Sequence, residues 1–412
     1  MSEWCEIKLG ELITDIAAGP FGSNLKVACF VDEGFPIIDG ANLKSFKVTD
    51  NITKFVTEEK ARSLKRSIAK RHDVVVTISG TLGQISYIPH DSQYAEYLCS
   101  QRQFRATFDE SRVNVPFLVY YFHTWEGQQR ILAYANRVGV PALFQPLKNF
   151  REIKMPLPDL PTQRRIAAVL GALDDKIENN RKICENLEAQ AQALFKSWFV
   201  DFEPWGGKMP EGWKKGKLRD IAGYDNRRIA ASNLTVETYF STENMLTDRG
   251  GVVAAASIPQ SGEVPLCEEG SVLVSNIRPY FKKIYRATET AGHSADVLCF
   301  EAKDSSWQWY LYRLLWDDAF FAYVMSGVKG CKMPRGDKEQ ILDYGCVIPG
   351  ADNVAEFNAV VEPMCQRITH CNKESRALAE MRDALLPQLM LGRLRVDATA
   401  CQGEIDVGKV EI

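Results

Sequence analysis

A run of cations is the most concentrated chemistry in this sequence. Residues 60–71 (KARSLKRSIAKR) hold six basic residues and no acidic one. Thr57, with Glu58 and Glu59 after it, would cap a helix at this point, so we predict a short basic helix. Such a run is often only a solvated face, but it can also contact nucleic-acid phosphates. The candidate phosphate contacts are Lys65, Arg66, Lys70 and Arg71.

Polar side chains in the predicted turns could read the edges of bases. Glutamine pairs with adenine, and arginine with guanine, through two hydrogen bonds each. In the first half the candidates are Ser79, Thr81, Gln84, Gln101, Arg102 and Arg105. In the second half they are Arg227, Arg228, Asn276, Arg278, Tyr280, Lys282, Lys283, Lys329, Lys332 and Arg335. We expect fewer than half of these residues to touch bases.

No catalytic constellation accompanies these candidates. The sequence has no G-x-x-x-x-G-K-[ST] loop for nucleotide phosphates and no Asn-Pro-Pro-aromatic motif of an adenine methyltransferase. The triplets 6–8 and 152–154 imitate part of a nuclease motif, but such triplets are frequent by chance in charged sequences. Cys365, His370 and Cys371 lie on a predicted helix without a second ligand pair, so core packing explains them better than zinc. We expect neither an enzyme nor a metal site.

Composition is that of an ordinary globular protein with 412 residues, 45% of them hydrophobic and 25% charged. The net charge of −3 differs from the basic stripe of a stand-alone DNA-binding protein, so local patches would have to act together with partners. The eleven cysteines have no repeating short spacing, and no signal peptide or membrane-length apolar run is present. We therefore expect reduced thiols and a cytoplasmic location.

Two aromatic stripes could suggest stacking on flipped bases. Large aromatics at helical spacing more often fill a core, and we prefer that interpretation. The stripes contain Tyr120, Tyr121, Phe122 and Trp125 in the first half, and Trp307, Trp309, Tyr310 and Trp316 in the second.

The chain repeats itself at an offset of roughly 190–210 residues. Each repeat begins at a tryptophan, Trp4 or Trp213, and continues through a run rich in β-branched residues at 72–88 or 269–285. Those runs predict buried strands joined by turns. An aromatic segment, a proline-bounded strand and a long helix complete each repeat. The alternative is a chance resemblance between two α/β domains.

Residues 163–198 and 356–391 are predicted to form two long helices. Apolar residues recur there in alternating steps of four and three, which is the seam of a coiled coil. A helix of roughly 36 residues is about 54 Å long and needs a partner for its apolar stripe. Antiparallel pairing of the two is the simplest arrangement, and packing of each helix on its own domain is the alternative. The seam includes Leu170, Leu173, Ile177, Asn180, Leu187, Leu194, Met364, Ile368, Leu378 and Leu385.

The two seams are unequal. Asn180 is the kind of polar seam residue that fixes register at a cost in stability. Ser375 and Arg382 interrupt the second seam, and Pro387 should kink the last turn of that helix.

Two stretches resemble the specificity subunit of type I restriction-modification enzymes. They are PLPDLPTQRRIAAVLGALDDKIENNRKICENLEAQAQALFKSWFVDFEP, residues 156–204, and ALLPQLMLGRLRV, residues 384–396. With the order of the globular parts, the resemblance spans nearly the whole chain. The second half departs from the pattern, because it has PGADNVAEFNAVV where the first has a Pro-x-Gln-Arg-Arg entry. Equivalent docking surfaces on both helices are therefore in doubt.

The resemblance implies an α+β fold with two target recognition domains, related by a pseudo-two-fold and separated by two antiparallel helices. It assigns residues 1–158 and 204–350 to the domains, 159–203 and 351–397 to the helices, and 398–412 to a tail. Each domain would read one half of a split DNA site, and the helices would set the gap, roughly 16 base pairs for about 54 Å.

The implied partners are double-stranded DNA, two methyltransferase subunits and, in the full complex, motor-nuclease subunits. S-adenosylmethionine, ATP and magnesium would belong to those partners. The competing interpretation is a coiled-coil scaffold that joins two protein-binding domains without touching DNA.

Overall fold

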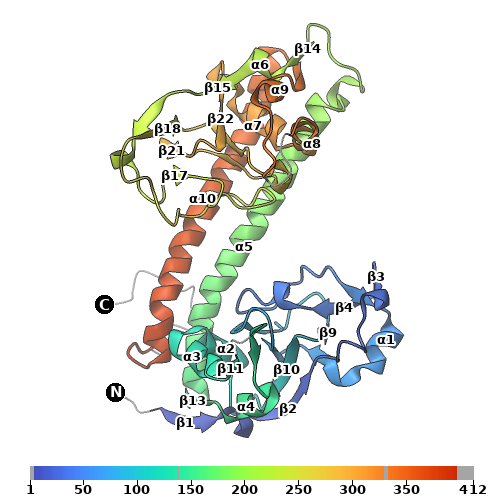
Figure 1. The fold of residues 1–412 in the computed structure, drawn as a ribbon, viewed down its shortest axis with the longest axis vertical. Coiled ribbons are helices and arrows are strands. Elements are labelled where there is room, and N and C mark those ends of the chain that lie inside the picture. Colours follow the sequence, from blue (N-terminus) through green and yellow to red (C-terminus); the bar gives the residue numbers. More distant parts are fainter. Residues whose placement is uncertain (1–3, 137–138, 329–332, 397–412) are drawn as a thin grey trace. The chain divides into compact units, whose positions relative to one another are not determined.

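The computed structural model describes residues 4–136, 139–328 and 333–396, and it divides into two compact units. Unit 1 comprises Met1–Ile177 and Arg376–Ile412, and unit 2 comprises Glu178–Ser375. Two helices of 40 residues, α5 (Leu160–Phe199) and α10 (Ala351–Met390), belong in part to each unit. Helices and sheets are both present in each unit (Figure 1), so the predicted α+β class is confirmed.

A four-stranded antiparallel sheet forms the centre of unit 1. Its strand order is β2 (Ile13–Ala18), β10 (Gln103–Phe108), β7 (Val74–Thr77) and β8 (Ile85–Tyr87). The β-branched run predicted at 72–88 therefore supplies two paired strands with a turn between them. Val74 and Val76 pack in one core with Phe104, while Val75, which points to the other face, packs in a second core with Ile38. Both faces of this sheet are covered.

A second, five-stranded sheet covers one of those faces. Its order is β3 (Phe30–Val31), β5 (Phe55–Val56), β4 (Phe35–Ile38), β9 (Glu96–Cys99) and β6 (Ile68–Lys70), with β4 and β9 parallel. The basic run enters this sheet. Thr57 does cap α1 (Glu58–Ser63), since its hydroxyl accepts from the Lys60 N–H at 3.2 Å.

The prediction that the basic run is helical as far as residue 71 is wrong. After α1 come a 3₁₀ turn, Lys65–Ser67, and the strand β6. Ile68 and Ala69 are both buried and belong to different cores, which requires the alternating geometry of a strand. Pairing with β9 therefore prevails over the local preference for a helix.

Unit 2 repeats the topology of unit 1. Its four-stranded antiparallel sheet has the order β15 (Ala222–Tyr224), β22 (Val297–Ala302), β19 (Val272–Ser275) and β20 (Ile284–Arg286). A two-stranded antiparallel sheet also recurs, as β1 (Cys5–Lys8) with β13 (Lys154–Leu157) and as β14 (Lys214–Lys217) with β23 (Gly345–Ile348). The second sheet of unit 2 contains β16 (Arg228–Ala230), β18 (Glu263–Cys267), β21 (Ala291–His293) and β17 (Tyr239–Phe240), the last two parallel.

The repeat extends to individual hydrogen bonds. Asn42 and Asn244 each close their own turn by accepting, through Oδ1, from the backbone N–H three residues earlier, at 3.0 and 2.6 Å. Gln84 and Lys283 then donate to a backbone carbonyl of that turn, at 2.9 and 2.6 Å. Identical roles for different side chains exclude a chance resemblance between the two halves.

The aromatic stripes form helices that cover the four-stranded sheets. These are α2 (Val115–His123) and α3 (Trp125–Leu132) in unit 1, and α7 (Gln308–Trp316) and α8 (Asp318–Ser326) in unit 2. The core interpretation holds for Tyr120, Tyr121, Phe122, Trp309 and Tyr310, all buried, and Trp307 and Trp316 are half-buried. It is wrong for Trp125, which opens α3 and is 78% exposed.

Short elements complete the two units. They are α4 (Pro146–Glu152), β11 (Ala135–Asn136) and β12 (Ala142–Leu143) in unit 1, and α6 (Leu218–Ile221) and α9 (Lys338–Leu342) in unit 2. No helix in the described ranges is long and apolar enough to cross a membrane.

The long helices pair antiparallel within each unit. In unit 1, Asp174 of α5 accepts from Arg382 of α10 at 2.8 Å. In unit 2, Asn180 of α5 donates to Glu374 of α10 at 2.7 Å. Of the predicted seam residues, the buried ones are Leu170, Leu173, Asn180 and Ile368, and the half-buried ones are Ile177, Leu187, Leu194, Met364, Leu378 and Leu385. Arg382, expected to interrupt the seam, is thus accommodated by an acidic partner.

Candidate nucleic-acid interface

Several predicted contact residues meet at one end of the central sheet of unit 1. There β2 and β7 end while β10 and β8 begin. Gly19 donates its backbone N–H to the carbonyl of Gln103 at 2.8 Å, and Ile78 donates to the carbonyl of Arg102 at 2.7 Å. The loops after β2, after β7 and before β10 are therefore adjacent, although they are far apart in the sequence.

Two further segments join this end. The hydroxyl of Ser67 donates to the carbonyl of Ala18 at 2.9 Å, which fixes the Lys65–Ser67 turn beside the end of β2. Gly80 donates its backbone N–H to the carbonyl of Pro141 at 2.9 Å. We call the five segments 19–24, 65–67, 78–84, 100–102 and 139–144 the unit 1 edge.

Unpaired cations are exposed at the unit 1 edge. Lys65, Arg66 and Arg102 are exposed, and none makes an ion pair with any residue that the structure describes. Gln101 and Thr81 are also exposed there, and Ser79 is half-buried. Gly80 has a φ of +95°, and a Cβ placed on it would lie 3.8 Å from a guanidinium nitrogen of Arg102. The distance leaves space for a side chain, so the positive φ is what favours glycine at this turn.

Two predicted base contacts are engaged inside unit 1 instead. Gln84 accepts from the hydroxyl of Thr77 at 3.0 Å and donates to the carbonyl of Gly40. Arg105 is only 8% exposed. We therefore withdraw both as DNA contacts, because their hydrogen-bonding groups hold the fold together.

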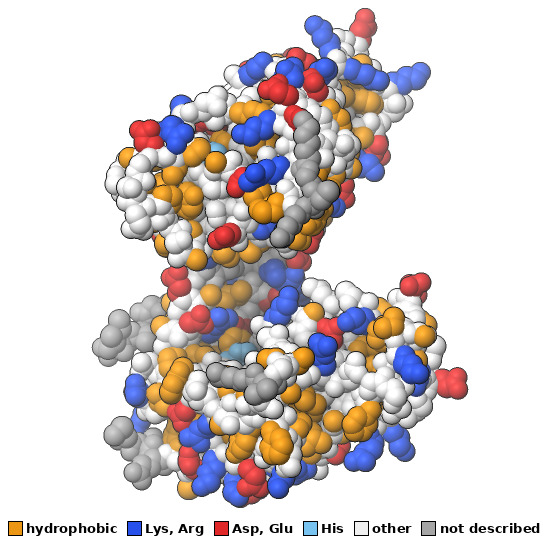
Figure 2. Space-filling view, viewed as in Figure 1, with side chains coloured by type: hydrophobic (Ala, Val, Ile, Leu, Met, Phe, Trp, Pro, Cys, Tyr) orange, Lys and Arg blue, Asp and Glu red, His pale blue; other side chains and the backbone are white. Residues whose placement is uncertain are grey.

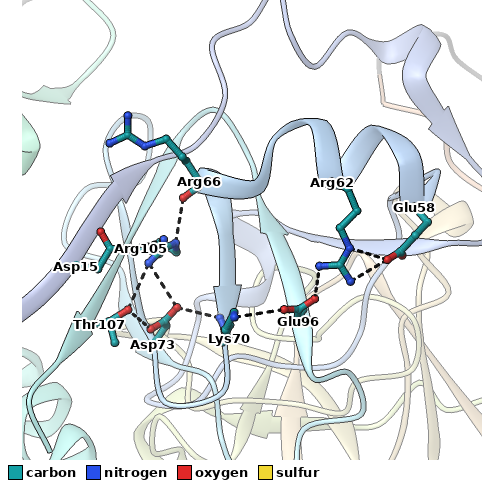
Figure 3. A network of polar contacts seen from close by, with 9 residues as sticks. All are labelled: Asp15, Glu58, Arg62, Arg66, Lys70, Asp73, Glu96, Arg105 and Thr107. Atoms are coloured by element: carbon teal, nitrogen blue, oxygen red, sulfur yellow. Dashed lines mark hydrogen bonds and ion pairs between the residues drawn. The ribbon is translucent and has the colours of Figure 1, made fainter.

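Figure 3 shows the network around Arg105. Its guanidinium bonds Asp15 at 2.6 Å and the carbonyl of Arg66 at 3.1 Å, and it lies 3.8 Å from Asp73. The bond from Arg105 lowers the pKa of Asp15, whereas burial raises the pKa of Asp73. The side chain of Arg66 points away from this network (Figure 3), so only its backbone is used and its charge is available.

The other cations of the basic run differ in their engagement. Lys70 lies 3.7 Å from Glu96, which also bonds Arg62 at 2.6 Å (Figure 3). Arg71 donates to the carbonyl of Ser92 at 2.9 Å. Lys65 and Arg66 are the members of the predicted set that the structure places at the unit 1 edge.

Unit 2 builds an equivalent edge with different side chains. Asn276 donates its backbone N–H to the carbonyl of Asp296 at 2.8 Å, and Arg278 donates to the carbonyl of Pro334 at 2.8 Å. These bonds match those of Ile78 and Gly80 in unit 1. Arg278 has a φ of +50° where unit 1 has a glycine, so unit 2 accepts a strained backbone and places a cation there. Segments 225–228, 276–283, 294–296 and 333–335 form the unit 2 edge.

The predicted residues at the unit 2 edge also divide into free and engaged groups. Arg278 and Tyr280 are exposed, and Arg278 has no ion pair in the described part of the chain. The engaged side chains are Arg228 with Glu263 at 3.7 Å, Lys282 with Asp318 at 2.9 Å, and Arg335 with Asp296 at 2.9 Å. Lys329 and Lys332 lie outside the described residues.

Two predicted contacts in unit 2 are not presented to a ligand: Lys283 holds a turn, and the Asn276 side chain is buried. The ammonium of Lys283 donates a hydrogen bond to the backbone carbonyl of Thr242 at 2.6 Å, and burial lowers the pKa of Lys283. Asn276 is 7% exposed, so its side chain is not presented to a ligand surface. We withdraw both as DNA contacts, because neither offers an exposed hydrogen-bonding group.

Arg227 is held by acidic residues that the sequence analysis missed. Its Nε and Nη2 donate to Asp225, the latter at 2.7 Å, and its Nη1 donates to Glu268 at 2.6 Å. Three of the five N–H groups of a guanidinium are used in this way. The remaining two stay available on a side chain that is 51% exposed.

Asp225 also belongs to a cluster that could hold a metal ion. Its ligand atoms and those of Cys299 and Glu301 lie within 4.8 Å of one another. Asp225 already holds Arg227, and Glu301 accepts from the hydroxyl of Ser271. Burial raises the pKa of the Cys299 thiol and of the Glu301 carboxyl, which favours their neutral forms. We assign no metal to this cluster.

On the face seen in Figure 2, charge is dispersed rather than gathered into a stripe. Figure 2 shows cationic and acidic side chains interspersed over the visible face of both units. This agrees with the net charge of −3 and distinguishes the chain from binders that hold DNA by a large basic surface.

The sequence and the fold have known relatives. Residues 1–189 match the family of the type I restriction modification DNA specificity domain. The type I restriction enzyme MjaIX specificity subunit of Methanocaldococcus jannaschii is 26% identical over 369 residues, 83% of this chain and 82% of that protein. The type I restriction enzyme HindI specificity subunit of Haemophilus influenzae is 54% identical over 52 residues, 13% of this chain and 11% of that protein.

A solved structure shares the fold. The S subunit of a Type-I restriction-modification system from M. genitalium has a TM-score of 0.58 with 15% identity, covering 94% of this chain and 96% of that chain. The likeness at this identity concerns the architecture alone.

These findings define the class of protein. The fold is that of a repeated α+β protein whose two units offer equivalent sheet edges. Residues 1–189 match the type I restriction modification DNA specificity domain, and the resemblance seen in the sequence is confirmed for that part of the chain. The curated relatives are named specificity subunits, which agrees with the expectation of a non-catalytic subunit.

Proposed function

We propose that each unit reads one half of a bipartite DNA site through its sheet edge, for a type I restriction-modification complex. The observation that carries this proposal is the pair of equivalent edges, each with the same backbone bonds and different exposed side chains. A constant frame with variable side chains is what two different half-sites require. The proposal rests on the relatives' specificity role as well.

The edges divide the work between position and sequence. In unit 1, Lys65 and Arg66 contact phosphates, and Gln101 and Arg102 meet base edges. In unit 2, Arg278 and Arg227 make the contacts to phosphates and base edges. Arg227 is the side chain that Asp225 and Glu268 hold in place. A guanidinium already oriented by two carboxylates loses less conformational freedom on binding than a free one.

The paired helices set the unread gap. Each has 40 residues, which corresponds to about 60 Å at 1.5 Å per residue. In this proposal the two helices, which belong in part to each unit, serve as the spacer between the readers. Exposed helix faces are where we place the methyltransferase subunits, and the motor-nuclease subunits would join through these.

Cofactors of the reaction belong to the partners in this proposal. S-adenosylmethionine would be bound by the methyltransferase subunits, and ATP and magnesium by the motor-nuclease subunits. DNA and all these subunits would meet in the cytoplasm.

The direct test reconstitutes the chain with its methyltransferase subunit and sequences the methylated positions in DNA from cells that carry both. The proposal predicts one split sequence, two short specified halves around a fixed unread gap. Methylation at a continuous sequence, or at no specific sequence, would refute it. A scaffold that joins two protein-binding domains would give the second result.

A further inference from the structure

Large apolar side chains are exposed at the unit 1 edge. Phe21 is 82% exposed, Val140 71% and Phe144 62%. Phe21 is the most exposed of the three and lies among candidate DNA contacts, where a bare aromatic ring calls for an explanation. The edge therefore combines unpaired cations with an apolar component that the polar candidates alone do not explain.

The loop that carries Phe21 is anchored to the sheet. A Cβ on Gly19 would lie 1.9 Å from the carbonyl oxygen of Ser100, so this close approach requires glycine. The Asn24 N–H bonds the carbonyl of Phe21 at 2.8 Å and closes a turn. A Cβ on Gly22 would lie 2.7 Å from Oε1 of Gln101, so the loop passes beside a candidate base-reading residue. Phe21 thus stands on a fixed turn.

Two cations lie in segments that adjoin the Phe21 loop in the fold. Lys26 follows in the same loop, and the Ser67 bond to the end of β2 brings Arg66 to its base. Neither cation has an ion pair among residues of the described ranges. Duplex DNA satisfies both components at once, because its phosphates attract the cations and its base stack accepts an apolar wedge.

We propose that Phe21 inserts between two stacked base pairs in the half-site that unit 1 reads and kinks the duplex there. The inference rests on the proposed function and adds a mode of recognition to it. Because base steps differ in how easily they unstack, the wedge selects sequence at a step that no hydrogen bond reads.

In the described part of unit 2, the loop equivalent to that of Phe21 carries no comparably exposed aromatic side chain, and the exposed Tyr280 of the unit 2 edge lies in a different segment. The segment after β15 passes directly into β16, and the residue in the register position of Phe21 is Ile229, which is half-buried. The unstacking is therefore confined to the half-site of unit 1, and the other half-site is an internal control.

The experiment uses the chain assembled with its methyltransferase subunit and a duplex that contains its methylation site. 2-Aminopurine replaces single bases along both half-sites, and its fluorescence rises where stacking is lost. Apart from each adenine that the methyltransferase flips out of the helix to methylate, the wild-type complex should unstack one step in the unit 1 half-site and none in the other. Phe21→Ala should abolish that signal and weaken binding roughly tenfold, whereas Phe21→Leu should retain part of both.

Trp125→Ala is the matched control, since Trp125 is a similarly exposed aromatic of unit 1 on a helix. It should leave the fluorescence unchanged. An unstacked step that persists in Phe21→Ala, or no unstacked step in the wild type, overturns the wedge while leaving split-site methylation intact. Loss of methyltransferase assembly in Phe21→Ala also overturns it, because Phe21 would then contact protein. Absence of sequence-specific binding by the wild type refutes the proposed function itself.

Discussion

At the scale of single residues, two arginines three positions apart in the sequence have opposite roles. Arg102 is exposed at the unit 1 edge without an ion pair in the described structure, whereas Arg105 is buried against Asp15 and Asp73. Arg102 lies in the turn before β10, whereas Arg105 lies within that strand and points toward the face that the second sheet covers. The sequence does not reveal that both faces of this strand are buried.

We predict that Arg102→Ala relaxes specificity and leaves stability unchanged. Loss of a bidentate base contact should reduce discrimination at one position of the half-site by about 1–3 kcal/mol. Competition binding against sites mutated at each position measures this. Arg105→Ala is the contrasting variant, which should lower the free energy of unfolding because it leaves buried Asp73 without its cation. If both variants lost the same stability, Arg102 and Arg105 would not have the separate roles in DNA recognition and in the fold that we assign to them.

Arg313 is the other residue whose charge belongs to the fold. Its side chain is fully buried in α7, bonds Glu188 of α5, and donates to Sγ of Cys365 of α10 at 3.1 Å. Arg313→Ala should cost about 3 kcal/mol, the lower end for a broken buried pair, since Glu188 keeps some exposure.

Chemical denaturation, followed by unit 2 tryptophan fluorescence, measures that loss. Arg181→Ala is the control, because Arg181 makes exposed pairs with Glu178 and Glu185 that are worth less than about 1 kcal/mol. If both variants lose the same stability, Arg313 does not join the sheet layer to the helices as we describe.

At the scale of elements, the helix pair depends on one buried polar residue. Asn180 is 0% exposed. Its Nδ2 bonds Glu374 and Ser375, but its Oδ1 has no partner. An unsatisfied buried acceptor is destabilising, so the residue is tolerated for register rather than for stability.

Asn180→Leu should therefore raise the free energy of unfolding by about 1 kcal/mol. The midpoint of urea unfolding reports it, and the exposed neighbour Asn179→Leu should leave that midpoint unchanged. A clear loss of stability in Asn180→Leu would show that the Nδ2 bonds outweigh the orphaned oxygen.

The elements show how far sequence reasoning reaches. The strands at 72–88 and the heptad seams were predictable, because their periodicity is local. The strand β6 was not, since it exists through pairing with β9, which lies far away in the sequence. For the same reason Gln84 and Lys283 could not be recognised as turn-holding residues, and Phe21 gave no signal beyond its place between two glycines.

At the scale of the whole molecule, the dispersed charge makes this chain a reader that depends on partners for affinity. With few unpaired cations at each edge, binding by the chain alone should be weak and should fall only gently with salt, because the slope scales with the number of phosphates neutralised. Addition of the methyltransferase subunit should raise affinity for the split site at least tenfold. Filter binding at two salt concentrations tests this, and equal affinity with and without the partner would contradict it.

The measurement that tests the central claim most directly is the methylated site of a helix-length variant. Four residues are inserted in α5 next to Asn179 and Asn180, and four at the matching level of α10 after Glu374. The pair then lengthens by about 6 Å, close to two base pairs at 3.4 Å each. Sequencing of methylated DNA should show the same two half-sequences with a longer gap. An unchanged gap, or altered half-sequences, would contradict two separate readers held apart by a helical spacer.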